Sequence, residues 1–198
     1  MKKFPFFKQL DSKDCGPNCL KIVARHFGKT IPIQELRELS ETLRIGTTLQ
    51  GLCNAAERIG IRTLPAKISY NQLDEVPLPC ILHWNNNHFL VLYRVKKDTC
   101  YVSDPAYGLL TYTKDEFVKH WIGNNADETT EEGIALLLEP TPKFYDVEYD
   151  PSKSKVDFTF LAKYLFRYKK FLLQLLFGLL AGSLLQLLFP FFFLNFLL

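Results

Sequence analysis

The sequence lacks the spacing of cysteine and histidine residues that marks a metal site. Its only close cysteine pair, Cys15 and Cys19, is not followed by a second cysteine or histidine pair at ligand spacing. His83 and His88 do not have the four-residue spacing of two ligands on one helix face. The five cysteines are an odd number without a regular pattern, so we expect free thiols in a reducing compartment.

The sequence also lacks a phosphate-binding loop, a signal peptide and a strong charge of one sign. No G-x-x-x-x-G-K-[ST] run occurs, so we expect no cofactor in this chain, ATP included. The first eight residues contain neither an apolar run of signal-peptide length nor a cleavage site, so we expect that the domain that follows is not exported by a signal of its own. The formal net charge of +3 and the absence of a basic patch among aromatics argue against a nucleic-acid partner.

Charged residues are absent between Phe171 and Leu198. A membrane helix needs roughly 20 apolar residues, so this segment is predicted to cross a membrane, the alternative being a buried core helix. Basic residues precede it at positions 163, 167, 169 and 170, which predicts that this end, and the domain before it, face the cytoplasm. Because the chain ends with the apolar run, we expect a truncated form of a longer membrane protein.

Three regions are expected. Prolines and mixed charge after Glu139 indicate a linker. We therefore predict a globular domain over residues 1–140, a linker over 141–157, and a juxtamembrane basic segment with a transmembrane helix over 158–198.

The globular domain is predicted to be α+β, with helices before strands. Helical spacing and caps predict three helices, over residues 15–27, 30–43 and 48–59. Short runs rich in Val, Ile, Leu and Tyr then predict a meandering antiparallel sheet. These strands are expected at 61–68, 80–84, 88–95, 100–104, 109–112 and 134–138. Thr113 and Glu116 form a capping-box sequence that predicts a further helix between the last two strands.

Cys15 is the strongest candidate for a nucleophile. It precedes Gly16 and Pro17, and proline favours the first turn of a helix, so the thiol is expected at a helix N-terminus. Free N–H groups and the helix dipole stabilise a thiolate at that position. The alternative is that Cys15 only fills a buried space, as we expect for Cys19.

A cysteine nucleophile needs a base and a group that orients the base. His88, at the start of an apolar strand, is the preferred base, and His83 is the alternative. Asp104, at the end of the next strand, is the preferred orienting residue, although Asp-Pro is also an ordinary turn. Gln9 is a candidate oxyanion donor with the Cys15 N–H group, the alternative being an exposed loop glutamine.

Three motifs together resemble the peptidase domain of bacterial peptidase-containing ABC transporters. They are Gln-x4-Asp-Cys-Gly from Gln9, His-Phe-x-Val-Leu from His88 and Asp-Pro-x-x-Gly from Asp104. The resemblance implies a papain-like cysteine peptidase that cleaves after double-glycine leaders. It also implies that Cys15 is the nucleophile, His88 the base and acid, Asp104 the orienting residue and Gln9 the oxyanion donor.

The implied function is the removal of leaders from bacteriocin-like or signalling precursor peptides at the bacterial inner membrane, coupled to export. The partners would be the leader-bearing precursor, the membrane, and the transmembrane and nucleotide-binding domains of the transporter, with a homodimer as one arrangement. ATP would then bind only to a nucleotide-binding domain absent from this sequence. The alternatives are a non-catalytic peptidase-like module that binds secretion cargo and a papain-like amidase of other specificity.

Overall fold

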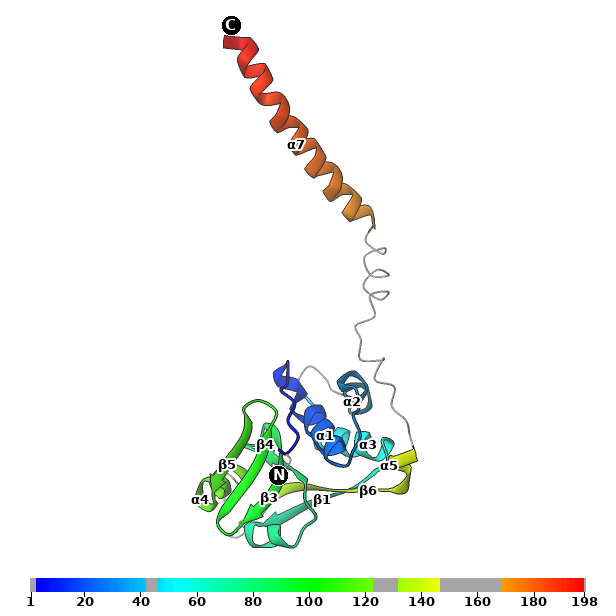
Figure 1. Cartoon of the computed structure of the whole chain (residues 1–198), viewed down its shortest axis with the longest axis vertical. Helices are drawn as coiled ribbons and strands as arrows, with labels where there is room; N and C mark the ends of the chain where they lie inside the picture. The colour runs from blue at the N-terminus through cyan, green and yellow to red at the C-terminus, as the bar shows by residue number, and fades with distance from the viewer. Residues whose placement is uncertain (1–2, 42–45, 123–131, 147–168, 198) are drawn as a thin grey trace. The chain divides into compact units, whose positions relative to one another are not determined.

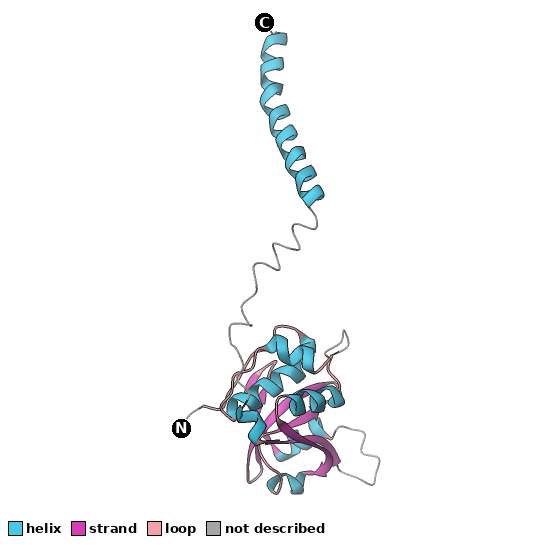
Figure 2. Ribbon diagram, turned by 90° about the vertical axis from the view of Figure 1, so that its right-hand side faces the viewer, coloured by secondary structure: helices cyan, strands magenta, loops and turns pink. Residues whose placement is uncertain are grey.

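The computed structural model describes residues 3–41, 46–122, 132–146 and 169–197 (Figure 1). The chain divides into two compact units, Met1–Ser154 and Lys155–Leu198. The first unit contains every strand of the described residues, and Figure 2 shows these strands as one sheet with helices packed on it. The predicted α+β class is therefore confirmed for this unit.

The sheet has six strands in the order β1-β6-β2-β3-β4-β5, and every pairing is antiparallel. The strands are β1 (Ile61–Ser69), β2 (Cys80–Trp84), β3 (His88–Lys96), β4 (Thr99–Asp104), β5 (Gly108–Thr113) and β6 (Glu132–Pro140). From β2 to β5 they form the expected meander. The expected meander is wrong for β6, which lies between β1 and β2. Local sequence patterns identify strands but not the strands with which they pair, so they could not predict this position.

The two faces of the sheet bury separate cores, and side chains alternate between them. In β3, Phe89 and Val91 join the core beneath the first three helices, whereas Leu90 and Leu92 join the core on the other face. The second core also holds Phe117, from the helix before β6. Figure 1 shows α1, α2 and α3 together on one side and α4 beside β5.

The first three helices mostly match the expectation. They are α1 (Cys15–His26), α2 (Ile33–Leu39) and α3 (Leu49–Arg58). Thr48 caps α3 by accepting a hydrogen bond from the Gly51 N–H at 3.0 Å. Helix α2 is shorter than predicted: it begins after Pro32 and its C-cap is Ser40, while residues 42–45 lie outside the described residues.

The remaining short helices of the first unit are η1 (Ser12–Asp14), η2 (Tyr70–Asp74), α4 (Lys114–Trp121) and α5 (Pro142–Asp146). The predicted capping box is confirmed at the start of α4, where Glu116 accepts hydrogen bonds from the backbone N–H and the hydroxyl of Thr113 at 3.0 and 2.8 Å.

Helix α5 lies where the linker was expected to begin. Pro142 is the first residue of the helix, where a backbone N–H would have no partner within the helix, so proline loses no hydrogen bond there. Phe144 is completely buried and packs against Gly60, whose φ of +87° is accessible to glycine. A Cβ atom at position 60 would lie 2.5 Å from the Phe144 backbone nitrogen. The folded domain therefore extends to Asp146, and an expected linker start at residue 141 is too early.

The second unit contains α7 (Lys169–Leu197), whose residues after Lys170 are uncharged. Within the parts of the chain that the structure describes, no helix is long and apolar enough to cross a membrane. The transmembrane helix stays a prediction.

Candidate active site

Cys15 is the first residue of α1 and lines a cleft of about 670 Å³. The other walls of this cleft come from η1, from residues 46–49 at the start of α3, from β2, β3 and the turn between them, and from Ile134 of β6. Only 6% of Cys15 is exposed, so solvent reaches it through the cleft rather than over an open surface. Its place as the first residue of α1 puts the thiol at the positive end of the helix dipole.

Gly16 allows α3 to approach the start of α1. A Cβ atom at position 16 would lie 2.9 Å from a methyl group of Leu52 and 3.1 Å from the Thr47 Cβ atom. The small residue after Cys15 therefore lets the cleft wall at 46–49 pack directly against the helix that carries the thiol.

The sheet brings His88 and Asp104 to one edge. His88 is the first residue of β3 and Asp104 is the last residue of β4, and the two strands pair with Val91 opposite Ser103. Because antiparallel neighbours run in opposite directions, the start of β3 and the end of β4 meet.

Asp104 holds the His88 imidazole by a hydrogen bond. His88 Nε2 lies 2.9 Å from Asp104 Oδ1, and the same oxygen accepts the Ala106 backbone N–H at 2.8 Å. Asp104 is 1% exposed, so this carboxylate is held in a fixed orientation. Cys15 also acts on the imidazole and raises the pKa of His88, and Nδ1 is the ring nitrogen that is not bonded to Asp104.

The surroundings of His88 favour its protonated form. Burial lowers the pKa of His88, but hydrogen bonds with Asp104 and Cys15 and the negative charge on these groups outweigh burial and raise the pKa to about 9. Near neutral pH the imidazole is therefore charged, which is the state that pairs with a thiolate and can donate a proton to a leaving amine.

The N-terminal segment holds the backbone of Gln9 beside Pro105, the residue after Asp104. The Gln9 backbone N–H donates to the Pro105 carbonyl oxygen at 2.9 Å, and the Ser103 hydroxyl donates to the Pro5 carbonyl oxygen at 3.0 Å. These contacts hold the segment along the end of β4. Gln9 Oε1 is buried and makes no hydrogen bond within the described residues, which is unusual for a polar atom outside a functional site.

His83, the alternative base, also lines the cleft. Its ring centroid lies 5.1 Å from that of Phe89, and burial lowers the pKa of His83, so it is neutral at physiological pH. Among the described residues, His88 and not His83 hydrogen-bonds with an aspartate. Of the other two histidines, His26 lies at the exposed end of α1, and His120 contacts Asn85 from α4.

Residues 3–126 match the model of the Peptidase C39 family. The chain belongs to the Peptidase C39 family. In sequence it is 37% identical over 163 residues to the Lactococcin-G-processing and transport ATP-binding protein LagD of Lactococcus lactis subsp. lactis, with 79% of the chain and 21% of that relative covered. It is 33% identical over 122 residues to the Colicin V secretion/processing ATP-binding protein CvaB of Escherichia coli, with 62% and 18% covered. The chain spans about a fifth of the length of these relatives.

Two solved structures have the same fold as this C39 domain. One is a double glycine motif protease from an AMS/PCAT transporter in complex with the leader peptide, with a TM-score of 0.63, 28% identity, and coverage of 70% of this chain and 93% of that one. The other is the peptidase domain of Streptococcus ComA, a bi-functional ABC transporter, with a TM-score of 0.62, 28% identity, and coverage of 70% and 100%.

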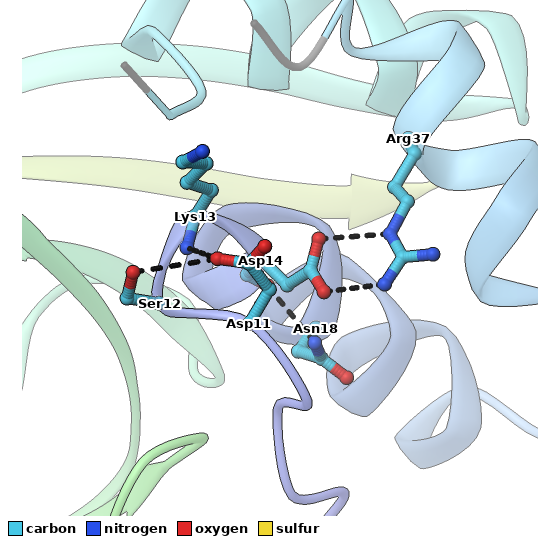
Figure 3. A network of polar contacts seen from close by, with 6 residues as sticks. All are labelled: Asp11, Ser12, Lys13, Asp14, Asn18 and Arg37. Carbon is cyan, nitrogen blue, oxygen red and sulfur yellow. Dashed lines mark hydrogen bonds and ion pairs between the residues drawn. The ribbon is translucent and has the colours of Figure 1, made fainter. Parts of the chain in front are cut away.

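Two features of the C39 site were not found from the sequence. The first is an ion pair between Asp14, directly before the candidate nucleophile, and Arg37 of α2 (Figure 3). Asp14 belongs to the first motif, but no local pattern connects it to a residue 23 positions later. In the sequence, the only indication of this ion pair was an aspartate directly before the cysteine.

The second feature is the β2–β3 turn, where Asn86 and Asn87 line the cleft. Asn85 and Asn86 have φ values of +48° and +57°, a left-handed conformation that asparagine tolerates better than most residues. His120 anchors the turn, because its ring lies 3.1 Å from Asn85 Oδ1 and its carbonyl oxygen accepts the Asn85 N–H at 3.0 Å. Three consecutive asparagines predict a turn, but not that it borders the cleft.

Proposed function

We propose that this C39 chain removes double-glycine leaders from bacteriocin-like or signalling precursor peptides. The observation that carries the proposal is the 2.9 Å contact between Asp104 and His88, together with the influence of Cys15, which lines the cleft, on the same imidazole. The similarity to the leader-peptide-bound protease of an AMS/PCAT transporter supports the choice of substrate.

In the proposed mechanism, the Cys15 thiolate attacks the carbonyl carbon after the second leader glycine. A carbon–sulfur bond forms, and the carbonyl oxygen becomes an oxyanion. As the carbon–nitrogen bond breaks, protonated His88 gives its proton to the leaving amine, and the mature peptide departs. Neutral His88 then takes a proton from water, and the hydroxide attacks the thioester carbon. The carbon–sulfur bond breaks, which restores the Cys15 thiolate beside protonated His88, and the leader leaves as a carboxylate after its acid proton is released to solvent.

Two further residues complete this proposal. Asp104 keeps the imidazole in one orientation and stabilises its charged form, through the 2.9 Å contact with Nε2. Gln9 would donate its side-chain N–H group to the oxyanion, together with the backbone N–H of Cys15. The held backbone of Gln9 and its otherwise unbonded side-chain oxygen are compatible with that role.

We also propose that the domain acts at the cytoplasmic face of the bacterial inner membrane, beside an export apparatus. The uncharged segment after Lys170 and the basic residues before it support a membrane anchor. The relatives are named as processing and transport or secretion ATP-binding proteins, which supports transporter and nucleotide-binding domains as partners. A homodimer is one arrangement of this assembly that we propose. ATP would then bind outside this chain.

The test is incubation of the full chain with a peptide whose leader ends in Gly-Gly, followed by mass spectrometry. We expect one cut, after the second glycine, and none with Cys15→Ala. Binding of the same peptide to wild type without any cut would contradict a peptidase and identify a cargo-binding module. A cut elsewhere would contradict the proposed specificity.

A further inference from the structure

The turn between β2 and β3 carries three asparagines, of which one is bonded to the rest of the domain and two are not. The Asn85 side-chain oxygen lies 3.1 Å from His120 Nδ1. Asn86 and Asn87 line the cleft that Cys15 also lines. Among the residues that the structure describes, none hydrogen-bonds to either of these two side chains. Both residues therefore bring to the cleft a side-chain amide whose donor and acceptor groups are available to a ligand.

The backbone of this turn is held in one conformation. Asn85 and Asn86 have φ values of +48° and +57°, and positive φ at both central positions is the pattern of a type I′ hairpin turn, which asparagine accommodates. The Asn87 N–H donates to the Trp84 carbonyl oxygen at 3.2 Å, and the Asn85 N–H donates to the His120 carbonyl oxygen at 3.0 Å. The two cleft-lining amides are therefore attached to a fixed backbone.

The C-terminal end of α4 supports the turn. The ring of His120 stacks on the ring of Trp84, with centroids 5.5 Å apart, and lies 6.1 Å from the ring of Tyr112. Trp84 is 4% exposed and belongs to the second core. The next residue of α4, Trp121, donates its Nε1–H to the carbonyl oxygen of Ile134 at 3.0 Å, and Ile134 also lines the cleft. The last two residues of α4 therefore hold two segments of the cleft wall.

A Gly-Gly segment offers a binding site its main chain and nothing else. Ordering two glycines costs more conformational entropy than ordering other residues, so hydrogen bonds to their N–H and C=O groups are needed to hold them for attack. A carboxamide side chain suits this task because it donates and accepts from neighbouring atoms, as a peptide group does. Thr48, another polar residue of the cleft wall, already uses its hydroxyl oxygen to cap α3.

We infer that Asn86 and Asn87 are specificity-determining residues that hydrogen-bond to the main chain of the substrate beside the cleaved bond, and that His120 is a positioning residue that holds their turn. The inference rests on the proposed function insofar as the cleft receives a double-glycine peptide. It deepens that function by naming side chains that recognise two residues without side chains of their own.

The experiment measures binding of a fluorescent peptide with a Gly-Gly leader by anisotropy, using the full chain with Cys15→Ala so that no cleavage intervenes. The variants in this background are Asn86→Gly, which tolerates the positive φ and removes only the amide, and Asn87→Ala. In four further peptides, one of the two backbone amides on each side of the cleaved bond is replaced by an ester, which lacks the N–H donor. Asn71→Ala, at an exposed position in η2 that does not line the cleft, is the matched control.

Hydrogen bonds to the substrate main chain predict coupled losses. Asn86→Gly and Asn87→Ala should each weaken binding about three- to tenfold, as expected for one neutral hydrogen bond, and Asn71→Ala should leave it unchanged. For each asparagine, at least one ester should weaken binding to the parent chain but cause no further loss in the variant, because both changes remove the same bond. Additive losses at all four positions, or unchanged affinity in both variants, would overturn the inference.

The role of His120 is tested by rescue. His120→Ala removes the ring that contacts Asn85 and should weaken binding of the all-amide peptide by a similar factor. His120→Asn keeps a side-chain N–H near the place of Nδ1 and should restore most of the lost affinity. Equal losses in the two variants, or no loss in His120→Ala, would contradict the positioning role.

Failure of this inference differs from failure of the proposed function. If the wild-type chain cuts after Gly-Gly while the ester and asparagine effects are additive, the inference alone is wrong. If the wild-type chain binds the peptide without cutting it, the proposed function is wrong, and the anisotropy measurements still decide whether the two asparagines bind the main chain.

Discussion

His88 and Asp104 are 16 residues apart in the sequence, yet His88 Nε2 lies 2.9 Å from Asp104 Oδ1 at one edge of the sheet. The pairing of β3 with β4 produces this contact, and the Ala106 N–H holds the same carboxylate oxygen. An imidazole bonded in this way has only Nδ1 left for Cys15. The contact between His88 and Asp104 supports the proposed catalytic roles of these residues and can be tested by substitution of either one.

Asp104→Asn should lower kcat by about 10²- to 10⁴-fold, because an amide no longer stabilises the charged imidazole and can favour the wrong tautomer. Steady-state cleavage of a Gly-Gly peptide measures the effect. Asp115→Asn, an exposed substitution on α4, is the control and should leave kcat unchanged. Normal turnover in Asp104→Asn would show that another residue orients His88.

The pH dependence of stability should reveal the charged state of His88. Its pKa is raised from 6.5 to about 9 in the folded chain, so the native state keeps a proton that the unfolded state releases between these values. The resulting stabilisation is complete below pH 6.5 and is lost as the pH rises through 9. Relative to His88→Gln, the free energy of unfolding should fall by the order of 2 kcal/mol over that range. If urea unfolding gave the same difference in free energy of unfolding between wild type and His88→Gln at pH 6 and at pH 9.5, the result would contradict this assignment.

The two candidate bases, His88 and His83, should behave differently. His88→Ala removes the proposed acid and base and should abolish cleavage, whereas His83→Ala removes only a neutral side chain from the cleft wall. We expect His83→Ala to raise KM by less than about tenfold with kcat retained. Full activity in His88→Ala together with complete loss in His83→Ala would reverse the assignment.

Helix α5 should contribute to the stability of the peptidase domain. Phe144 is fully buried, so Phe144→Ala should lower the free energy of unfolding by about 3–5 kcal/mol. The neighbouring Tyr145 is 56% exposed, and Tyr145→Ala should have an effect below about 1 kcal/mol. Equal effects of the two substitutions in urea unfolding would mean that α5 does not pack as described.

Much of the fold and part of the site could be predicted from local sequence. The start of α1 at Cys15 follows from its Gly-Pro neighbours, and β2 has the expected ends because its apolar run is bounded by proline and asparagine. Helix α5 was missed because two prolines and mixed charge indicate a linker, while the contact between Phe144 and Gly60 depends on tertiary packing. The position of β6 depends on pairing between distant segments in the same way.

In the candidate site, too, some residues could be predicted from local sequence and others depend on tertiary contacts. Cys15, His88 and Asp104 occur in short motifs whose residue types suggest their chemistry. Arg37 has no such motif, because its importance comes only from the partner that it meets across two helices.

The most direct test of the central claim is to trap the covalent intermediate on Cys15. A peptide with a Gly-Gly leader is mixed with the full chain, quenched in acid during the first turnover and analysed by mass spectrometry. The account predicts that the fragment containing Cys15 gains the mass of the leader minus water, and that Cys15→Ala neither gains this mass nor cuts the peptide. The same Gly-Gly cut at an undiminished rate in Cys15→Ala would contradict the account.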